Sequence, residues 1–438
     1  MNNLKLFKNY KQLLTDYISF KSISTDPQYK SEIQKVVSWL RGVLENNNLI
    51  VKVIKGYGNP IVLAETKHDP TKKTVLIYGH YDVQPASKEE GWSSEPFELV
   101  EKKDRFIARG AMDNKGQFLI HLVNILDLFK QNKLKYNIKF LIEGDEEVGS
   151  EHLDKFIAKY KKDLSSDFII ISDGPQPKNL PTIETSFRGI ANMTISYKAL
   201  NSDVHSGSFG GVLPNAALEL VKLLSGIHKN NRVNVNGFYK GTKQPQMYKN
   251  WDYSLEEINK LTGAKAIFFE KGLNYVTQKG LRPSIEITTF NSGYLGEGYR
   301  NSIPAKAQAK INIRTVEGQK IKDVISAVKV FIQENTPNYI DYDVQVSGGN
   351  LDAVKIDTSS KYFKYVESSL KDVYGQKVIF NPVGGTLPII KYFQEILKVP
   401  VIPVPLANSD SRMHGVDENM TKRNIALGME FSRRLLTI

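Results

Sequence analysis

The sequence predicts an α/β protein with a mostly parallel sheet and helices on both faces, interrupted by an inserted α+β domain with an antiparallel sheet. In the first 186 residues and again after residue 350, short apolar segments alternate with helical patterns, which is typical of a buried parallel sheet. Between them, segments such as 190–197 alternate apolar and polar residues, as half-exposed antiparallel strands do. A chain of 438 residues is also too long for one ordinary core, which favours two domains.

The first and last parts of the chain, residues 1–186 and 350–438, are expected to form one catalytic-type α/β domain. Apolar residues at helical spacing predict helices over 6–17, 33–44 and 116–130, from near Ser150, over 360–374 and 387–397, and after Asp417. Continuous apolar runs predict strands at 50–54, 61–64, 74–78, 137–142, 168–172, 377–380 and 400–404.

The middle of the chain, residues 187–349, predicts the smaller inserted domain. Its expected strands lie at 190–197, 283–289, 307–315 and 339–346, and its expected helices at 215–227 and 320–334. The polar and aromatic stretch 238–280 is interpreted as an elaboration of this domain. We find no tandem repeat and no low-complexity segment.

Composition and charge exclude several classes of protein. The chain has no cysteine, so disulfides and cysteine nucleophiles are excluded and any metal site must use His, Asp and Glu. The N-terminus lacks the features of a signal peptide and no apolar run reaches about 18 residues, so we expect a cytoplasmic protein without a membrane partner. The net charge is +12, but the lysines are scattered and no dense arginine tract occurs, which favours a solvated basic surface over a nucleic-acid partner.

The most informative stretch is an acidic cluster that follows the predicted strand 137–142. Four carboxylates, Glu143, Asp145, Glu146 and Glu147, lie within five positions. Carboxylates this close repel one another unless a cation or a proton neutralises them. A metal site with its own general base would require this arrangement. An acidic turn that caps the next helix is the structural alternative, and this stretch alone does not decide between them.

Four other places carry metal-ligand chemistry. His80 and Asp82 end a buried strand, Asp113 lies in a turn before a helix, Asp173 follows an apolar strand, and His414 lies in a polar loop. Each has an ordinary structural explanation as a turn, cap or strand-end residue. Together they lie where strands leave the sheet, which is the edge where α/β proteins bind ligands. Two imidazoles and several carboxylates without cysteine suit zinc or a similar divalent ion.

At these motifs the chain resembles the M20 family of dinuclear metallopeptidases. The resemblance spans residues 78–415 and is carried by YGHYDVQPA, RGAMDNKGQ, EGDEEVGS, ISDG, HSG, NSIPAKAQAKINIR, GGTLP and MHG. YGHYDVQPA and the long insertion in the second domain are most similar to the carnosinase or Cys-Gly dipeptidase branch. The sequence departs from the family pattern at HGVDE, where relatives often carry an Asn-Glu pair, and at Thr386, where this branch often has Ser.

The resemblance implies two divalent metal ions per chain, with zinc expected and manganese or cobalt as alternatives. His80 and Asp173 would hold one ion, Glu147 and His414 the other, and Asp113 would bridge them. In each pair the carboxylate and the imidazole come from different segments of the chain.

The resemblance also assigns the catalytic roles. Glu146 would be the general base acting on a metal-bridging water, and Asp82 would hydrogen-bond the ring of His80 and fix its orientation. His205 would reach the active site of a partner subunit and stabilise the oxyanion, which implies a homodimer through the inserted lid domain. From the sequence alone, a surface histidine is the favoured explanation of His205.

The expected activity is hydrolysis of the amide bond of dipeptides or short peptides with a free C-terminal carboxylate. By resemblance, Arg314 and Asn301 would face the substrate and Thr386 would lie near its carboxylate, for which a guanidinium at a strand end is chemically suited. An N-acyl-amino-acid deacylase or desuccinylase with the same mechanism is the alternative substrate class. A metal-binding scaffold without catalysis is disfavoured, because all five ligands and the base are present.

Overall fold

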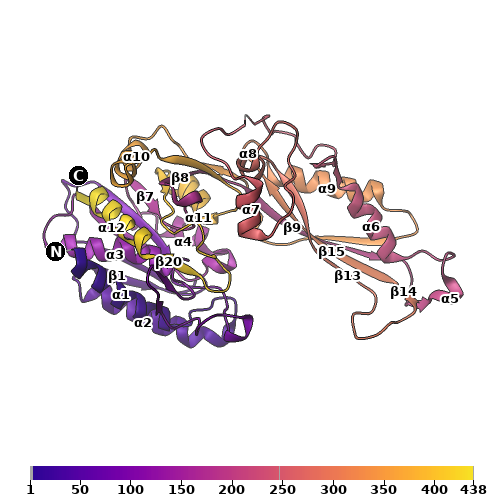
Figure 1. The fold of residues 1–438 in the computed structure, drawn as a ribbon, viewed down its shortest axis with the longest axis horizontal. Coiled ribbons are helices and arrows are strands. Elements are labelled where there is room, and N and C mark those ends of the chain that lie inside the picture. Colours follow the sequence, from indigo (N-terminus) through magenta and orange to yellow (C-terminus); the bar gives the residue numbers. More distant parts are fainter. Residues whose placement is uncertain (1–2, 246, 438) are drawn as a thin grey trace. The chain divides into compact units, whose positions relative to one another are not determined.

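The computed structural model describes residues 3–245 and 247–437 and divides the chain into two compact units (Figure 1). The first unit contains Met1–Thr185, Ile356–Asn381 and Leu387–Ile438. The second contains Ser186–Lys355 and Pro382–Thr386. The second unit is therefore an insertion in the sequence of the first, and a short later segment of the chain joins it.

A six-stranded sheet forms the centre of the first unit. Its strands, in spatial order, are β1 (Ile50–Ile54), β2 (Ile61–Glu65), β6 (Asn137–Glu143), β3 (Thr74–His80), β7 (Phe168–Ile171) and β19 (Val401–Pro403). The four strands from β6 to β19 are parallel, whereas β1 and β2 pair antiparallel at one edge. Every residue of β3 and β7 is buried, as expected for central strands covered on both faces.

Helices cover both faces of this sheet. Helix α3 (Lys115–Lys130) packs on β3 and is flanked by α1 (Asn3–Ser19) and α12 (Lys422–Thr437). A Cβ at Gly79 would lie 2.5 Å from the ring of Phe118 on α3, so the glycine permits this close approach. The preceding residue, Tyr78, points to the other face, where its ring meets Phe393. That face carries α4 (Leu153–Lys159), α11 (Pro388–Tyr392) and a π-helical turn at Phe393–Leu397.

Further helices and short sheets lie outside the central sheet. Helix α2 (Lys30–Glu45) packs on β1 and β2, and α10 (Lys361–Tyr374) packs on α12. Two three-stranded sheets were not predicted from the sequence. They consist of β20 (Asn419–Thr421), β5 (Arg105–Ile107) and β4 (Val100–Glu101), and of β17 (Val354–Lys355), β8 (Thr182–Phe187) and β18 (Ile379–Val383).

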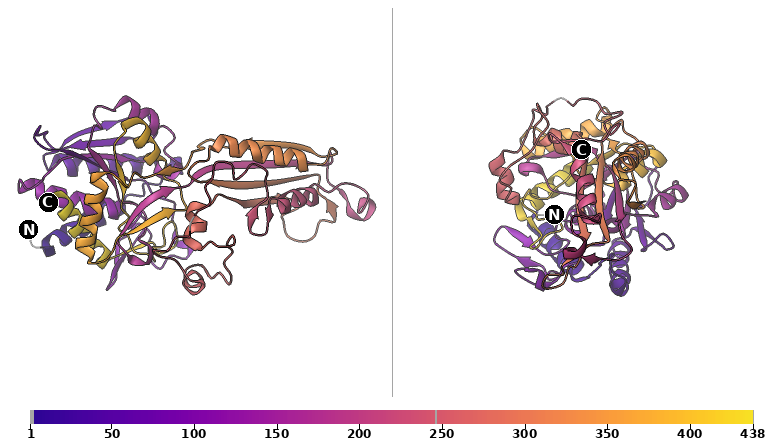
Figure 2. Two further views of the ribbon diagram at one scale, coloured as in Figure 1. Left: turned by 90° about the horizontal axis from the view of Figure 1, so that it is seen from above. Right: turned by 90° about the vertical axis from the view of Figure 1, so that its right-hand side faces the viewer.

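The second unit is built on a four-stranded antiparallel sheet. Its spatial order is β13 (Ser284–Ser292), β15 (Lys306–Thr315), β9 (Gly189–Lys198) and β16 (Asp341–Val346). Alternate residues of β9 are buried, so one face of the sheet forms a core and the other does not. Helices α6 (Ala216–Gly226) and α9 (Ile321–Asn335) run along the sheet and supply much of the rest of that core (Figures 1 and 2).

A buried ion pair ties the stretch 238–280 to the rest of the second unit. It contains α7 (Leu255–Thr262) and α8 (Tyr275–Leu281). The guanidinium of Arg282 donates three hydrogen bonds of 2.7–3.0 Å to Glu270. The ring of Tyr239 lies 4.6 Å from this guanidinium and 4.8 Å from that of Arg232. These contacts satisfy charges that would otherwise be costly to bury.

The predicted fold class is confirmed, with local corrections. The helix expected from near Ser150 begins at Leu153, because Glu146–Val148 forms a 3-10 turn and Ser150 has a φ of 50°. The helix expected over 387–397 divides into α11 and the π-helical turn. Within the described residues, no helix combines the length and the apolarity needed to cross a membrane.

Candidate metal centre

The parallel register of the central strands brings three predicted ligands to one edge of the sheet. His80 is the last residue of β3 and lies opposite Glu143, the last residue of β6. Asp173 follows β7, which pairs with the other side of β3. Because the strands run in the same direction, the residues that leave their carboxyl ends converge. The turn after β6 then places Glu147 at the same edge.

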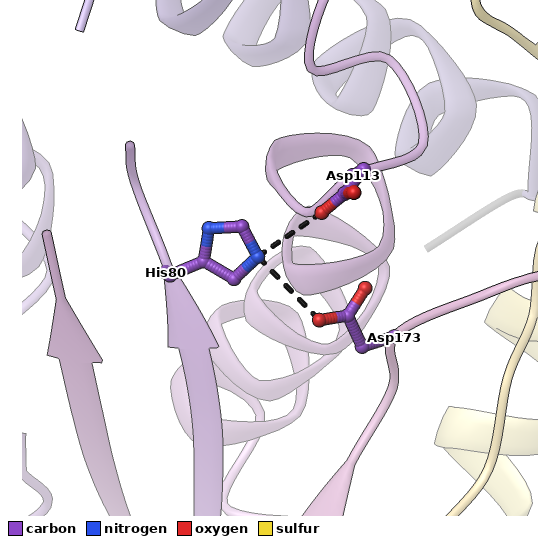
Figure 3. Close-up of side chains that lie close together, drawn as sticks. All are labelled: His80, Asp113 and Asp173. Carbon is purple, nitrogen blue, oxygen red and sulfur yellow. Dashed lines mark ion pairs between the residues drawn. The ribbon is translucent and has the colours of Figure 1, made fainter. Parts of the chain in front are cut away.

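Asp113 approaches the ring of His80 from the turn before α3. Figure 3 shows the carboxylates of Asp113 and Asp173 directed at the same ring nitrogen. His80 Nε2 lies 3.1 Å from Asp113 Oδ1 and 3.4 Å from Asp173 Oδ2. His80 is fully buried, and Nε2 makes no well-aligned hydrogen bond among the described residues. A buried nitrogen facing two carboxylate oxygens in this way suits a metal ligand.

The second oxygen of Asp113 belongs to another cluster. His414 Nε2 lies 2.9 Å from Asp113 Oδ2 and 3.3 Å from Glu147 Oε2. His414 has a φ of 60° in the loop before β20, and its side chain is about half exposed. The ligand atoms of His80, Asp113 and Asp173 lie within 4.8 Å of one another, as do those of Asp113, Glu147 and His414. Asp113 is common to both groups, with one oxygen in each.

Without metal ions, protons neutralise this cluster. Burial would raise the pKa of Asp113, but the imidazoles of His414 and His80 hold it below its ordinary value. The carboxylates of Asp113 and Glu147 raise the pKa of His414 to about 10. Burial lowers the pKa of His80, yet Asp113 and Asp173 outweigh it and hold that pKa well above its usual range. The cluster therefore keeps positive charge among its carboxylates at neutral pH.

The residues of the cluster fit two divalent cations. Two imidazoles and three carboxylates supply two groups of three ligands that share one carboxylate. Nitrogen and oxygen donors without thiolates are the ligand types found in hydrolytic zinc, manganese and cobalt sites. A divalent ion in each group would replace the protons that the imidazoles otherwise carry.

The acidic cluster divides into structural and functional halves. Glu143 accepts hydrogen bonds from the hydroxyls of Tyr78 and Ser150 at 2.6 and 2.8 Å, and burial raises its pKa to about 7. Asp145 accepts hydrogen bonds from the backbone and the side chain of Asn59, both at 2.7 Å. These two residues stabilise the turn, as the structural explanation of the acidic cluster expects. The metal-site explanation applies to the other two, Glu146 and Glu147.

Glu146 lies beside the cluster and belongs to neither ligand group. It is half-buried at the start of the turn Glu146–Val148. Burial, reinforced by the charges of Asp173 and Asp113, raises its pKa well above the ordinary value. A carboxyl group in this environment has a raised proton affinity, which suits general acid–base work.

Asp82 connects the two ligand groups. His80 Nδ1 lies 3.1 Å from the Asp82 carbonyl oxygen and 3.3 Å from its Oδ1. The other carboxylate oxygen, Oδ2, accepts a hydrogen bond from the backbone N–H of Glu147 at 3.0 Å. Asp82 therefore fixes the orientation of one imidazole ligand and the backbone of one carboxylate ligand.

Sequence reasoning missed the network that supports Asp113. Glu418 is fully buried, and its Oε1 accepts the backbone N–H groups of Met112 and Asp113 at 2.9 and 3.1 Å. Arg109 donates to Glu418 Oε2 at 2.8 Å and to the carbonyl of His414 at 3.1 Å. The motif HGVDE contained the signal, because a carboxylate after the histidine can bind N–H groups of a tight turn.

A third partner of the ligands, Gln84, was also not predicted. Its Nε2 donates to Glu147 Oε2 at 2.8 Å. The residue lies in YGHYDVQPA, one of the motifs that carry the family resemblance. Its position in that motif was the available signal.

Two of the predicted substrate residues meet in the second unit. Arg314 Nη1 donates to the hydroxyl of Thr386 at 2.9 Å, and its Nε donates to Asn312 at 2.9 Å. Thr386 in turn donates to the carbonyl of Arg188 at 2.6 Å, and the Arg188 side chain donates to Gly384 at 2.7 Å. Arg188 was not predicted, and it holds the GGTLP segment against the start of β9.

The third predicted substrate residue, Asn301, lies together with His205 elsewhere in the second unit. His205 ends β10 (Val204–His205), which pairs with β14 (Ser302–Ile303), and the carbonyl of Asn301 accepts the N–H of Ser206 at 3.0 Å. His205 is exposed, and its Nδ1 accepts the N–H of Ser208 at 3.2 Å. A neutral ring bonded in this way carries its proton on Nε2, which is then a free donor. The approach of His205 and Asn301 to the metal centre stays a prediction.

The fold and this cluster define the class of a metal-dependent hydrolase with an inserted domain. Residues 76–437 match the model of Peptidase family M20/M25/M40, so the chain belongs to that family. The predicted family and enzyme class are thereby confirmed.

Similar proteins of known activity narrow the branch within the family. The Cys-Gly metallodipeptidase DUG1 of Saccharomyces cerevisiae is 31% identical over 391 residues, which cover 85% of this chain and 80% of that protein. The Beta-Ala-His dipeptidase of Rattus norvegicus is 31% identical and covers 84% of this chain and 77% of its own. The crystal structure of human carnosine dipeptidase 1 superposes with a TM-score of 0.84 at 27% identity, over 99% of this chain and 98% of that one. The predicted resemblance to the carnosinase and Cys-Gly dipeptidase branch is confirmed.

Zinc binding to the metal-free protein should release protons, at least about one per ion, because both ligand imidazoles hold raised pKa values and a metal requires their neutral form. Calorimetric titration at pH 7.5 in buffers of different ionisation enthalpy measures this release. The affinity of the protein for zinc should rise with pH, by up to about tenfold per pH unit for each proton released. A binding heat that does not depend on the buffer would contradict this reading of the cluster.

Proposed function

We propose that this chain is a dinuclear metal-dependent dipeptidase that hydrolyses the amide bond of dipeptides with a free C-terminal carboxylate. The observation that carries the proposal is the pair of ligand groups that share Asp113. Glu146, whose carboxyl group has a raised proton affinity, lies beside these groups. The activities named for similar proteins, Cys-Gly and Beta-Ala-His dipeptidases, support the dipeptide substrate class.

The proposed ligands are His80 and Asp173 for one ion, Glu147 and His414 for the other, and Asp113 for both. Their mutual distances of 2.9–3.4 Å support this assignment. When bound, two divalent ions supply positive charge that polarises the scissile carbonyl and makes water more acidic. Zinc is the proposed metal, with manganese or cobalt compatible with the same donors.

Glu146 is the proposed general base. Its carboxylate takes a proton from the attacking water and returns it to the leaving amine, so the residue serves first as base and then as acid. Its raised proton affinity without metals supports this use. Asp82 acts through the ligands and not on the substrate, because its contacts hold the ring orientation of His80 and the backbone of Glu147.

The second unit supplies the proposed substrate contacts. Arg314 presents a guanidinium that the hydroxyl of Thr386 helps to orient, and a guanidinium binds a carboxylate through two parallel hydrogen bonds. Asn301 is proposed to contact the same substrate. Recognition of a free C-terminal carboxylate favours dipeptides, although an N-acyl-amino acid carries the same group and remains the competing substrate class.

A homodimer through the second unit is the proposed assembly. β13 is an edge strand with Ile287 and Phe290 each 43% exposed. The opposite edge strand, β16, instead carries Asp341 and Asp343. β13 carries one charged residue, Glu286. Charges oppose the pairing of strand edges, so the edge with fewer charges is the better candidate for pairing with another copy. His205 is the residue proposed to act on the substrate of the partner subunit.

Glu146→Gln should lower kcat by about 10²–10⁴-fold, because the substitution removes the base and keeps the shape. Metal content should stay at two ions per chain and KM should change little. The measurement combines metal analysis with turnover of a dipeptide panel and of acetyl- and succinyl-amino acids on the same samples. Glu151→Gln, an exposed neighbour, is the matched control and should behave as wild type.

Two outcomes of that comparison would change the proposal. Wild-type protein that cleaves only acyl-amino acids would transfer the assignment to the deacylase class. Loss of metal from Glu146→Gln would make Glu146 a ligand and not the base.

Arg314→Gln should raise KM for dipeptides by roughly 10- to 100-fold, because a charge-assisted contact to the substrate carboxylate is lost. The same dipeptides with a C-terminal amide should be poor substrates of the wild type. Their rate of hydrolysis should fall little further in the variant, because they lack the carboxylate that Arg314 is proposed to bind. Lys310→Gln, which removes an exposed charge from the same strand, is the control. An equal loss on acid and amide substrates would argue against the carboxylate contact.

A mixture of His205→Ala and Glu146→Gln chains should regain about one quarter of wild-type activity after subunit exchange. Half of a random mixture is heterodimer, and one of its two sites then has both residues intact. Mixing Glu146→Gln with Glu146→Ala gives the control, in which no site recovers. Complete exchange without recovery would show that His205 does not act across the interface.

A further inference from the structure

We propose that Ser24 is a positioning residue of the metal centre. Its hydroxyl holds the Asp82 carboxylate that orients His80, and it thereby sets the affinity of the ion held by His80 and Asp173. Ser24 lies in the segment Phe20–Ser24, which follows α1 and is far in sequence from the ligands. The inference rests on the proposed function, because it concerns the same metal centre.

The segment Phe20–Ser24 runs alongside the residues that follow β3. The carbonyl of Ser22 accepts the N–H of Val83 at 3.1 Å, and the hydroxyl of Ser22 donates to the carbonyl of Tyr81 at 2.6 Å. Ile23 and Val83 form a parallel bridge and are both buried. Backbone, side-chain and apolar contacts therefore fix this segment against the loop that carries Asp82.

A second contact ties the segment to the turn of Asp113. The Lys115 ammonium group is fully buried at the start of α3, and it donates to the carbonyls of Tyr17 and Phe20 at 2.9 Å each. These carbonyls lie at the end of α1, where carbonyl groups lack helical partners and attract a cation. The position of the segment is thus determined from both sides of the metal centre.

Within this frame, Ser24 contacts Asp82 directly. Ser24 Oγ donates to Asp82 Oδ2 at 2.8 Å. The same oxygen accepts the N–H of Glu147 at 3.0 Å, and the other oxygen faces Nδ1 of His80 at 3.3 Å. Asp82 is fully buried, and a buried carboxylate needs donors to stay charged and fixed.

Loss of the Ser24 hydroxyl would leave Oδ2 with the backbone donor alone. The carboxylate could then rotate, and Nδ1 of His80 would keep only the backbone carbonyl of Asp82 as a partner. Partners that orient a ligand from outside the coordination sphere typically contribute 10–100-fold to metal affinity. Loss of the hydroxyl is therefore expected to weaken the binding of one of the two ions. Activity should fall only because that ion is bound less tightly.

Equilibrium dialysis against zinc held at fixed free concentrations by a chelator tests the inference. Wild type should bind two ions, and Ser24→Ala should bind one of them roughly 10-fold more weakly. Ser24→Thr keeps the hydroxyl and should restore affinity close to wild type. Ser19→Ala loses an exposed hydroxyl that donates to the carbonyl of Asp16 and serves as the control.

A double-mutant cycle separates positioning from a general effect on folding. In an Asp82→Ala background, Ser24→Ala should have little further effect on zinc affinity, because its hydrogen-bond partner is gone. Additive losses, or wild-type affinity in Ser24→Ala, would overturn the inference. A lower urea midpoint of metal-free Ser24→Ala with unchanged zinc affinity would also overturn it. Wild type that binds no zinc would instead remove the proposed function itself.

Discussion

Repulsion among the carboxylates that surround Asp113 is the constraint on which the rest of this structure depends. Asp113 and Asp173 face one buried nitrogen of His80, and Asp113 and Glu147 face one nitrogen of His414. Like charges about 4 Å apart repel by about 4 kcal/mol at the effective dielectric of a protein surface. Protons on the imidazoles offset this repulsion in the metal-free chain, and two divalent ions would offset it further.

The scaffold around the ligands resists this repulsion through buried hydrogen bonds. Glu418 holds the turn of Asp113 by two backbone N–H groups, and Arg109 links Glu418 to the loop of His414. Asp82 holds His80 and the backbone of Glu147. Because each supporting group is itself buried and bonded, the ligands cannot move apart without loss of several hydrogen bonds. This explains how the fold keeps the cluster assembled without the ions.

Periodicity and local motifs predicted the fold class and most elements, because buried parallel strands and amphipathic helices have strong patterns. The continuous apolar run of β3 is one such case, and the alternation along β9 is another. The short sheets were missed, since strands of two or three residues such as β4 and β20 have no periodicity. The turn after Gly144 was also misjudged, because Ser150 and Gly149 adopt positive φ and delay α4.

The residues around the metal centre were predicted less completely than the ligands. The proposed ligands lie in short motifs at strand ends, so sequence reasoning reached them together. Glu418 and Ser24 act through contacts between segments about 60 to 300 positions apart, and no local pattern encodes such pairs. Arg188 likewise meets Gly384 only in the folded chain.

The most direct test of the central claim is a crystal structure of the zinc-loaded protein with anomalous diffraction data collected on both sides of the zinc absorption edge. Two anomalous peaks are expected, one between His80, Asp113 and Asp173, and one between Asp113, Glu147 and His414. A single peak, or peaks away from the Asp113 carboxylate, would contradict a dinuclear centre bridged by that residue.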